Sequence, residues 1–537
     1  MKTEECAQSR GNECMKLEYR SFEEAQKCFQ WSERWQVFDE SPDHLNITYE
    51  CVDRHPARKV AIRLKRDDGG TETYTFGQLR YLSSQVANML QRRGINRGDR
   101  VALILGPSIQ YYAAFFGTLR RGAVAVPCYA LLGPDGIEHR LKTSGARTAI
   151  ISEERKHCVP PGLVSDLITS EELLDLIAKE STCYEADTSA DTLALIQFSS
   201  GTTGQPKPLP YPHGAISVTA VFTKFWLGLR DDDLYMCNSS PAWGHGIWYG
   251  TVGPLIFGNG IGSYAGKFTP EMFLEGLQEF GITVVSTMPR VYKMIMDSGK
   301  IDNYKLNLRR LTYTGGKIDS SVLEYFKAKC GLEIGSNYGN TESGPLVIDF
   351  AFDDWKVKRG SAGKPMLGVK MGILDEHGNE LPPGESGSVA VWRKGRWNHV
   401  GDSGHFDAEG YFWPEGRTDD VIKSSGYRIG PFEIEAVIEK HRAVERSAVV
   451  GSPDGERGEI VKAFVVLKSE FNPRPELATE IQDFVKARLS MHEYPREIEF
   501  IDEIPVTPDG KLKRRELKMR EYEKKSSQLN RVGAHSS

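Results

Sequence analysis

The stretch "FSSGTTGQPKPLPYPHG", residues 198–214, decides how the rest of the sequence is interpreted. It continues the apolar run "LALIQF" (193–198), which predicts a buried strand. Its Ser and Thr hydroxyls stand beside glycines, and the backbone N–H groups of such a loop can hold phosphate oxygens. The loop is not a Walker A motif, because Gly201 and Gly204 are three residues apart and Pro208 follows Lys207. From the loop alone, a phosphate site and a Gly/Ser-rich surface turn are equally favoured.

Strand-like runs and helical stretches alternate on both sides of this loop. The runs are "VALIL" (101–105), "AVAVP" (123–127), "RTAII" (147–151), "ITVVST" (282–287), "LTYTGG" (311–316) and "LEIGSNYG" (332–339). This repetition predicts an α/β fold with two doubly wound, mostly parallel sheets. Such sheets bind ligands at the carboxyl ends of their strands. We therefore expect a site where the Gly/Ser/Thr loop, "TGGK" (314–317) and "YGNTESG" (338–344) follow their strands.

One helix can be predicted residue by residue. Tyr112, Phe115, Phe116 and Leu119 recur at helical spacing between the runs 101–105 and 123–127. They predict a helix with one apolar face, and Gly122 is the residue expected to end it.

The pattern changes near residue 350. Residues 369–392 alternate apolar and polar side chains between turns, which is typical of hairpins in a small barrel or sheet. After 416–420 come a strand-turn signal, a helix, and an amphipathic helix with Leu477, Ile481, Phe484, Val485 and Leu489. We predict an N-terminal domain over 1–418, with αβ subdomains at 60–190 and 191–350 and a β-barrel at 351–418. A mobile α+β C-terminal domain over 419–537 follows, and residues 1–50 are a polar, partly helical entry segment.

Composition excludes several classes of protein. The 537 residues carry a net charge of −5, which gives no electrostatic reason for nucleic-acid binding. The nine cysteines form no CxxC pair, which favours reduced thiols. The polar beginning is unlike a secretory signal, and no run of about 20 apolar residues predicts a membrane span. The basic stretch 511–525 is interleaved with glutamates and fits a solvated helix face. We expect a cytoplasmic protein without stable membrane insertion.

Five motifs, in order, resemble those of the acyl-adenylate-forming enzymes. They are "SSGTTGQPKP" (199–208), "YGNTESG" (338–344), "VGDSGHFDAEGYFWPEGRTDD" (400–420), "IKSSGYRIGPFEIE" (422–435) and "PVTPDGK" (505–511). "SSGYRIGP" and "RGEIVKAFVVL" (457–467) are most similar to the medium-chain acyl-CoA synthetases. The resemblance implies an AMP-forming acid–thiol ligase with ATP, Mg²⁺ and CoA, which adenylates a carboxylic acid and then forms its CoA thioester.

The resemblance also implies the nucleotide site. Thr203 and its neighbours follow the β- and γ-phosphates, Glu342 holds Mg²⁺, and Lys511 bridges the carboxylate and the α-phosphate. Asp402 and Arg417 bind the ribose, although Val400 stands where relatives have threonine. The implied ATP and AMP ligands are Ser200, Gly201, Thr202, Thr203, Gly204, Lys207, Gly315, Gly316, Lys317, Ser336, Asn337, Tyr338, Gly339, Asn340, Thr341, Asp402, Arg417, Arg428 and Lys511.

The second step needs a thiol at the same carbonyl carbon. In the family the C-terminal domain rotates for it, and Asp419 matches the hinge. Gly426 lets the backbone approach pantetheine closely, which makes it a catalytic candidate beside Lys511, Thr203 and Glu342. The implied CoA ligands are Ser425, Gly426, Tyr427, Arg428, Arg457 and Lys486, the last of which equally fits an ordinary helix-surface lysine.

The acyl pocket is expected beneath residues 239–255 and 286–292. Its candidates are Trp243, Gly244, His245, Trp248 and Tyr249, where aromatic rings close a pocket and glycines leave room. His245 fits a hydrogen-bonded structural residue better than a base. The branch resemblance implies a medium-chain, branched, alicyclic or aromatic acid such as benzoate, and a place in fatty acid metabolism.

Two alternatives stay open at this stage. The first is an adenylation enzyme that loads a separate carrier protein, and the second is an inactive nucleotide- or acyl-binding regulator. ATP–pyrophosphate exchange and the identity of the acyl acceptor separate them from a CoA ligase. A homodimer is a further expectation, and a lysine acetyltransferase and deacylase acting on Lys511 are expected partners by analogy with relatives.

Overall fold

The computed structural model describes residues 17–199, 206–266, 268–316, 318–340, 343–417, 420, 422–424, 427–454, 457–488, 494–507 and 512–533. The chain divides into two compact units, Met1–Arg359 with Met366–Gly368, and Gly360–Pro365 with Val369–Ser537. Each unit is described by itself. The domain boundary at Asp419 stays a prediction.

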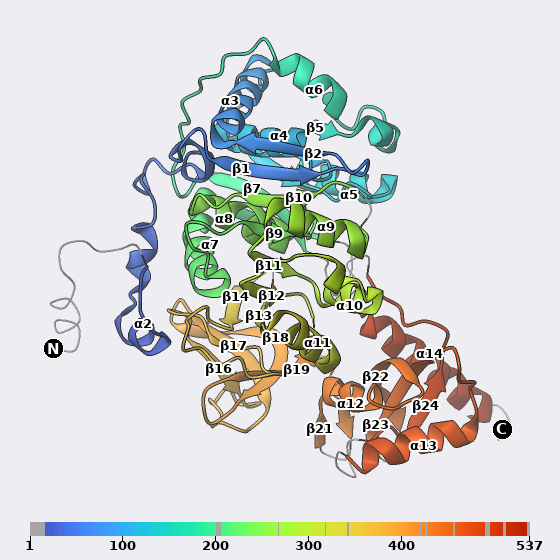
Figure 1. The fold of residues 1–537 in the computed structure, drawn as a ribbon. Coiled ribbons are helices and arrows are strands. Elements are labelled where there is room, and N and C mark those ends of the chain that lie inside the picture. Colours follow the sequence, from blue (N-terminus) through green and yellow to red (C-terminus); the bar gives the residue numbers. More distant parts are fainter. Residues whose placement is uncertain are drawn as a thin grey trace. The chain divides into compact units, whose positions relative to one another are not determined.

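The first unit holds a six-stranded sheet with the order β6-β5-β3-β4-β7-β8 (Figure 1). Its strands are β3 (Arg100–Ile104), β4 (Val124–Pro127), β5 (Thr148–Ile151), β6 (Asp166–Thr169), β7 (Leu193–Ser199) and β8 (Lys207–Pro212). All pairs are parallel except β7 with β8. Its helices are α3 (Phe76–Arg92), α4 (Ile109–Arg120), α5 (Pro134–Ser144) and α6 (Ser170–Ile177). The runs predicted at 101–105, 123–127, 147–151 and 193–198 therefore form β3, β4, β5 and β7, whereas β6 was not predicted.

Helix α4 is buried on every side, and not on one face only as the spacing predicts. All of its residues except Gln110 are buried, because α4 packs both on β3 and β4 and on α3. Gly117 permits the close contact with α3, since a Cβ there would come within 2.5 Å of the Val86 Cβ. Gly122 follows the helix with φ of 75°, as expected of a residue at a helix end.

Strand β8 is an edge strand that carries Pro208, Pro210 and Pro212. Successive N–H groups of a strand point to opposite sides, so the three positions without an N–H fall on the outer edge. Lys207, Leu209 and Tyr211 occupy the intervening positions, whose N–H groups face β7. Pro208, which departs from the family pattern, thus fits this edge without costing a ladder hydrogen bond.

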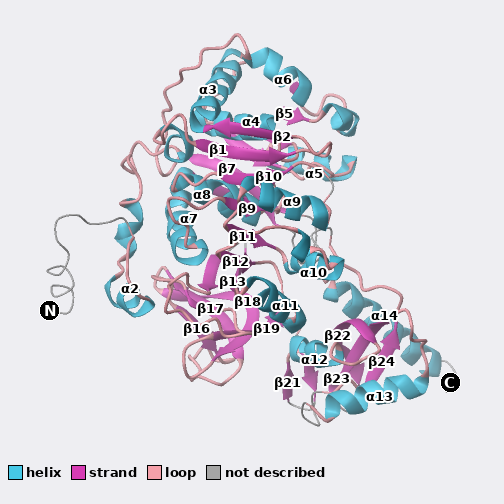
Figure 2. Ribbon diagram, viewed as in Figure 1, coloured by secondary structure: helices cyan, strands magenta, loops and turns pink. Residues whose placement is uncertain are grey.

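The first unit also contains a larger sheet with the order β14-β13-β12-β11-β9-β10-β1-β2. Its strands are β1 (Val60–Lys65), β2 (Thr71–Thr75), β9 (Tyr235–Cys237), β10 (Ile261–Tyr264), β11 (Val284–Thr287), β12 (Arg310–Tyr313), β13 (Ile334–Asn340) and β14 (Gly344–Ile348). The interior pairs are parallel, and β2 and β14 are antiparallel to their neighbours. Helices α9 (Pro270–Phe280), α10 (Pro289–Ser298) and α11 (Ser320–Cys330) bury an apolar core with this sheet. Two sheets with helices against them confirm the predicted α/β fold class (Figure 2).

The entry segment is built into the first unit. It contains α2 (Phe22–Cys28), η1 (Trp31–Trp35) and η2 (Tyr49–Asp53). Glu50 is fully buried, accepts the N–H groups of Asp39 and Glu40, and lies 2.6 Å from Arg54. Thr48 donates its hydroxyl to the carbonyl oxygen of Phe116 in α4. The segment therefore supports the core beside α4.

Cysteine pairing differs from the expectation in one place. Cys51, Cys128, Cys158, Cys183, Cys237 and Cys330 are free, whereas Cys28 is disulfide-bonded. The expectation of reduced thiols throughout is therefore wrong at Cys28. Within the described ranges, no helix has the length and apolarity that crossing a membrane requires.

The second unit contains two sheets. The four-stranded antiparallel sheet has the order β16-β17-β18-β19, and the other has the order β21-β20-β23-β22 with β24 paired parallel to β23. The strands of these two sheets are β16 (Met371–Leu374), β17 (Gly387–Arg393), β18 (Arg396–Phe406), β19 (Phe412–Arg417), β20 (Ile422–Ser424), β21 (Tyr427–Ile429), β22 (Val444–Asp454), β23 (Gly458–Leu467) and β24 (Glu497–Phe500). The two-residue strand β15 (Lys364–Pro365) belongs to neither sheet. The region predicted as a barrel or sheet of hairpins thus forms the four-stranded sheet.

Helices α12 (Pro431–Ile438) and α13 (Pro475–Lys486) share one apolar core with β22 and β23. Helix α14 (Arg514–Gly533) packs on β22. Leu477, Ile481 and Val485 are buried, as the amphipathic pattern of α13 predicts, and Phe484 is partly buried. Leu489 lies outside the described residues.

Candidate functional site

Two predicted nucleotide segments meet at the carboxyl ends of β12 and β13. These strands are parallel neighbours, with Tyr313 beside Ser336. Just after β12, the hydroxyl of Thr314 donates to Oδ1 of Asn337, a residue within β13, over 2.7 Å. This bond joins "TGGK" to "SNYGN", which are separated in sequence but expected at one edge of the sheet. Lys317 lies outside the described residues.

Gly315 lies against the indole of Trp243. Its φ of +90° is in the left-handed region, and a Cβ there would come within 2.9 Å of Cη2 of Trp243. A side chain at this position would therefore both strain the backbone and displace the ring. The contact brings a predicted nucleotide segment and a predicted acyl-pocket residue together.

Asp349 anchors the start of "SNYGN" and was not identified in the sequence. Its carboxylate accepts the N–H of Ser336 at 2.8 Å, the hydroxyl of Ser336 at 2.9 Å and the indole N–H of Trp355 at 3.0 Å. Burial raises the pKa of Asp349, and the hydrogen bonds oppose this effect. Its position 13 residues after Ser336 gave no sequence signal of the contact.

A short hairpin connects β13 and β14. Asn340 pairs with Gly344, and Oδ1 of Asn340 accepts the N–H of Ser343 at 2.7 Å. Gly339 allows close backbone packing here, because a Cβ would lie 2.3 Å from the Gly344 carbonyl oxygen. Thr341 and Glu342 fall between these positions, outside the described residues. Over the described part of the chain, no cluster of three or more His, Cys, Asp or Glu residues could hold a metal.

The Gly/Ser/Thr loop connects the antiparallel strands β7 and β8. Ser199 and Lys207 form their last pair, and Lys207 is exposed. The candidate residues Ser200, Gly201, Thr202, Thr203 and Gly204 lie outside the described residues. The loop thus begins at the carboxyl end of β7, as predicted.

His245, a predicted acyl-pocket residue, is buried. It begins η6 (His245–Val252), which is a π-helix. This geometry is rare in proteins overall, but where it occurs it is often at a functional site. Its Nδ1 lies 2.7 Å from the hydroxyl of Ser239 and its Nε2 lies 2.8 Å from that of Ser286 in β11. Burial lowers the pKa of His245 to about 3, so the imidazole is neutral at physiological pH.

Aromatic rings surround His245. The ring centroids of Trp243, Trp226 and Tyr249 lie 5.5, 6.0 and 6.5 Å from that of His245. Trp248 is buried and packs on Tyr211 at 5.4 Å. These contacts bring residues 239–255 and the strand end at Ser286 together in one neutral, aromatic region.

The glycines of this region allow close packing of the chain and do not themselves leave open space. A Cβ at Gly244 would meet the amide of Gln197 at 3.0 Å, and one at Gly246 would meet the Ser240 carbonyl oxygen at 2.1 Å. Gly250 faces Cys237 at 3.1 Å. The expectation that these glycines leave room is therefore wrong at all three, because protein atoms fill the space. Gln197 is 1% exposed, and its Oε1 has no hydrogen-bond partner among the residues that the structure describes.

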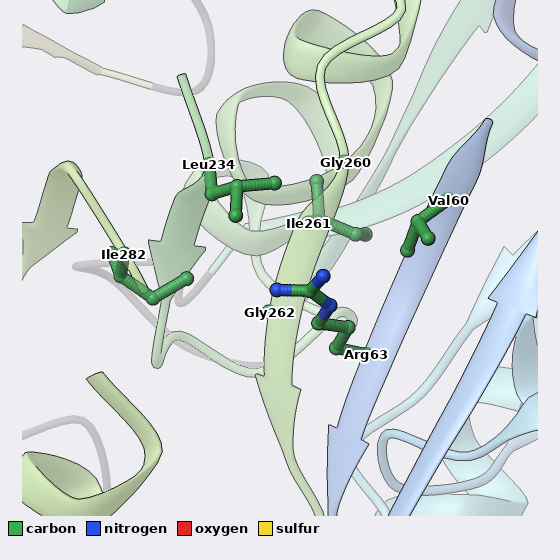
Figure 3. Close-up of a pocket in the computed structure, with 7 residues that line it drawn as sticks. All are labelled: Val60, Arg63, Leu234, Gly260, Ile261, Gly262 and Ile282. Carbon is green, nitrogen blue, oxygen red and sulfur yellow. The ribbon is translucent and has the colours of Figure 1, made fainter. Parts of the chain in front are cut away.

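A small cavity lies elsewhere in the larger sheet, beside β1 and β10 (Figure 3). It is lined by Val60, Arg63, Leu234, Gly260, Ile261, Gly262 and Ile282. None of the predicted site residues lines it, and it has no room for a water molecule. It is a packing defect and not the substrate site.

In the second unit, Asp402 of β18 and Arg417 of β19 occupy directly opposed positions. Both are predicted ribose ligands from one motif. The antiparallel register brings their backbones together across the two strands.

A different strand pairing joins the neighbours of two predicted CoA segments. Ser424, which precedes Ser425 and Gly426, pairs with Gly458, which follows Arg457. The N–H of Arg457 donates to Asp454 at 2.9 Å, and its guanidinium lies 3.9 Å from the same carboxylate. Ser425 and Gly426 lie outside the described residues, as do the side chains of Tyr427 and Arg428.

Lys486 ends α13, where its ammonium lies 5.4 Å from the ring centroid of Tyr494. This contact gives the lysine a structural role on the helix surface. It does not join Lys486 to the paired strands that carry Ser424 and Gly458.

Lys511 and Asp419 lie outside the described residues, but their neighbours are connected. Val506 and Leu512 form a bridge that closes the loop containing Lys511. Arg514 is 6% exposed on its side chain and lies 2.6 Å from Glu435 and 3.3 Å from Asp420. Its Nε also donates to the carbonyl oxygen of Val449 at 3.0 Å. Asp420, which follows the predicted hinge residue, is thus paired with Arg514, which lies three positions after Lys511.

Known proteins share both parts of this arrangement. Residues 49–397 match the family described as AMP-binding enzyme, and residues 433–511 match the AMP-binding enzyme C-terminal domain. The chain is 32% identical to the acetyl-coenzyme A synthetase of Bacillus subtilis (strain 168), over 93% of this chain and 95% of that protein. It is 34% identical to the mitochondrial acyl-coenzyme A synthetase ACSM3 of Rattus norvegicus, over 90% and 92%.

Solved structures agree with these matches. The fold is similar to that of the anthranilate CoA ligase AuaEII in complex with anthranoyl-AMP, with a TM-score of 0.83 and 26% identity over 93% of this chain and 100% of that one. A benzoate CoA ligase from Burkholderia xenovorans LB400 gives a TM-score of 0.78 and 29% identity over 88% and 99%.

Proposed function

Because this chain belongs to the AMP-binding enzyme family and is an AMP-forming acyl-CoA synthetase, we propose that its acid carries a compact apolar group. Benzoate, and branched, alicyclic or medium-chain acids, are the candidates. The observation that carries this proposal is the contact of the Trp243 indole with Gly315 on one side and with the neutral His245 on the other.

The chemistry proceeds in two steps that need different residues. The carboxylate oxygen attacks the α-phosphorus of ATP, pyrophosphate leaves, and an acyl-adenylate forms. The CoA thiolate then attacks the acyl carbon, the bond from that carbon to the phosphate oxygen breaks, and AMP leaves. The first step brings anions together, so positioned donors and cations are the main means of catalysis.

We assign the first step to the nucleotide residues. Lys511 neutralises charge between the carboxylate and the α-phosphate, while Thr203 and the loop amides follow the departing pyrophosphate. Asp402 and Arg417 bind the ribose, and the bond between Thr314 and Asn337 supports the adenine segment. Mg²⁺ is assigned to Glu342, because a carboxylate oxygen is the ligand type that this hard cation prefers.

The acid class is argued from charge and shape. His245 is buried and neutral with both ring nitrogens hydrogen-bonded, so it offers no charge to a polar acyl chain. The surrounding rings are large and rigid, namely those of Trp243, Trp226 and Tyr249. Protein atoms fill the space that a side chain at Gly244 or Gly246 would need. A planar or branched apolar group is suited to such walls, whereas a long chain needs a continuous tunnel.

A substrate panel tests the acid class. Acetate, isobutyrate, cyclohexanecarboxylate, benzoate, octanoate and palmitate are compared by pyrophosphate release with CoA present. We expect the highest kcat/KM with one of the middle four acids. The highest value for acetate or palmitate would contradict the proposal. Trp243→Leu should move the preference toward octanoate, and Trp31→Leu, the same change in η1 of the entry segment, serves as the matched control.

Control by acetylation is a second proposal for Lys511. Acetylation removes the ammonium charge, so the modified protein should lose adenylation as a Lys511→Ala variant does. Protein acetylated with a chemical donor and mapped by mass spectrometry provides the test, and full activity at complete Lys511 acetylation would disprove it. The homodimer and the cytoplasmic location stay predictions from the sequence.

A further inference from the structure

The hairpin between β17 and β18 ends in the hexapeptide "WRKGRW", residues 392–397. Trp392 pairs with Trp397 and Arg393 pairs with Arg396, so Lys394 and Gly395 form a two-residue turn. Residues 388–400 contain no Asp or Glu. We call residues 392–397 together with Lys370 the basic tip.

The tryptophans of the basic tip form a row with Lys370. The N–H of Trp392 donates to the carbonyl oxygen of Lys370, so the two residues are neighbours across β16 and β17. The indoles lie 5.2 Å apart, and the ammonium of Lys370 lies 5.0 Å from Trp392 and 5.3 Å from Trp397. Trp397 rests on Gly372, where a Cβ would come within 2.7 Å of its ring. Trp392 stays 41% exposed, although large apolar side chains are usually covered.

The sequence of the turn is unfavourable for the hairpin itself. Lys394 has φ of 50°, in the left-handed region, where Asn or Gly is strongly preferred for such a turn. Arg393 and Arg396 are directly opposed like charges, which destabilises a strand pair. Residues that are unfavourable for the local fold are expected at sites where they have a function, such as binding.

We propose that the basic tip is a peripheral docking surface for anionic lipid bilayers. Tryptophan is preferred at the boundary between apolar chains and headgroups. Lys370 lies beside the exposed indole, Lys394 and Arg396 are exposed in the same turn, and these cations complement anionic headgroups. A nucleic acid fits less well, because Lys370 lies over the rings of both tryptophans, where a stacking base would have to bind. We expect binding to the bilayer to be reversible, because only the tip of one hairpin contacts it.

Vesicle co-sedimentation of the full chain tests the proposal. Phosphatidylcholine vesicles with and without phosphatidylglycerol are compared at low and high salt. We expect binding to the anionic vesicles only, and salt should weaken it. The double variant Lys394→Glu, Arg396→Glu should lower the partition coefficient about tenfold or more, because each cation near an anionic surface contributes appreciably. Trp392→Ala should lower it several-fold, and Trp392→Tyr should restore most of the binding.

Matched controls separate the basic tip from general charge. Arg58→Glu, Lys179→Glu reverses two exposed cations of the first unit and should leave vesicle binding unchanged. All variants should keep wild-type pyrophosphate release with a water-soluble acid, which distinguishes this proposal from the proposed acid class. Equal binding to neutral and anionic vesicles, equal loss in both double variants, or binding to a DNA oligonucleotide instead of vesicles would overturn it.

Discussion

Asp402 and Arg417 face each other across the antiparallel strands β18 and β19. A single structural register therefore places two proposed ribose ligands side by side, although the turn 407–410 separates their strands. The pairing is part of the sheet itself, so the backbone positions of these two proposed ligands are fixed by the fold.

Replacement of Asp402 should weaken nucleotide binding. We expect Asp402→Asn to raise KM for ATP about tenfold or more, because hydrogen bonds to a charged acceptor contribute about 1.5–3 kcal/mol each. KM for the acid should change little. ATP–pyrophosphate exchange measures both values, and Asp375→Asn, in a turn of the same sheet, is the control. Equal KM values for ATP in the two variants would contradict the assignment.

Lys511 can be tested in the adenylation step with the nearby Lys513 as its control. Lys511→Ala should abolish adenylation but leave thioester formation from pre-made acyl-adenylate largely intact. Lys513→Ala, which removes a cation that lies 3.6 Å from Glu516, should leave both steps near wild type. Each half-reaction is followed by quenched-flow assay. Loss of both steps to the same degree in Lys511→Ala would exclude separate residues for the two steps.

Gly426 should matter only for the second step. A Leu side chain there is expected to block pantetheine, so Gly426→Leu should form acyl-adenylate normally and lose CoA-dependent AMP release. Gly426→Ala should show an intermediate loss, because its added volume is smaller. If Gly426→Leu turns over CoA at the wild-type rate, its placement in the CoA channel is wrong.

Buried histidines should make stability depend on pH. His245 binds a proton near pH 6.5 when unfolded but only near pH 3 when folded. The unfolded state therefore binds more protons between these values, and the free energy of unfolding should fall as pH falls, by about 1.4 kcal/mol per pH unit below about pH 6. His213, whose pKa burial also lowers to about 3, acts in the same direction.

Urea unfolding from pH 7.5 to pH 5 measures this dependence. His245→Asn should show a flatter dependence than wild type, because the remaining slope comes from other groups including His213. The pH profile of kcat/KM should contain no contribution from His245. A bell-shaped profile whose acid limb disappears in His245→Asn would instead make this residue a base.

Arg514 should stabilise the C-terminal part of the second unit. Removing one partner of a buried ion pair costs about 3–5 kcal/mol, and Arg514→Ala leaves both Glu435 and Asp420 without this cation. The sequence has no tryptophan after Trp413, so hydrogen exchange of α12 and α14 is the suitable measurement. Arg515→Ala, an adjacent exposed arginine, is the control. Unchanged protection in α12 would contradict a stabilising role.

The parallel strands could be predicted because strands buried on both faces are continuous apolar runs. The runs at 101–105 and 147–151 correspond closely to β3 and β5. Side-chain networks could not be predicted in this way. Asp349 and Arg514 are an ordinary acid and an ordinary base in the sequence, and only the fold buries them against Ser336 and Glu435.

Two local features could not be predicted from the spacing of apolar residues. A π-helix has no apolar spacing that distinguishes it within an aromatic stretch, so η6 was not predicted. In the sequence, glycines at 244, 246 and 250 fit either an open pocket or close packing. The structure shows close packing, because neighbouring protein atoms lie where each Cβ would be. In contrast, the position of Thr314 just after a strand followed from the predicted topology.

The alternating prolines of β8 have a consequence for assembly. An exposed edge strand offers N–H donors to which a strand of another molecule can add, as in amyloid growth. Pro208, Pro210 and Pro212 remove these donors along the whole outer edge of β8. The β8 edge next to the Gly/Ser/Thr loop thus offers few N–H donors to a foreign strand, which disfavours edge-to-edge polymerisation there.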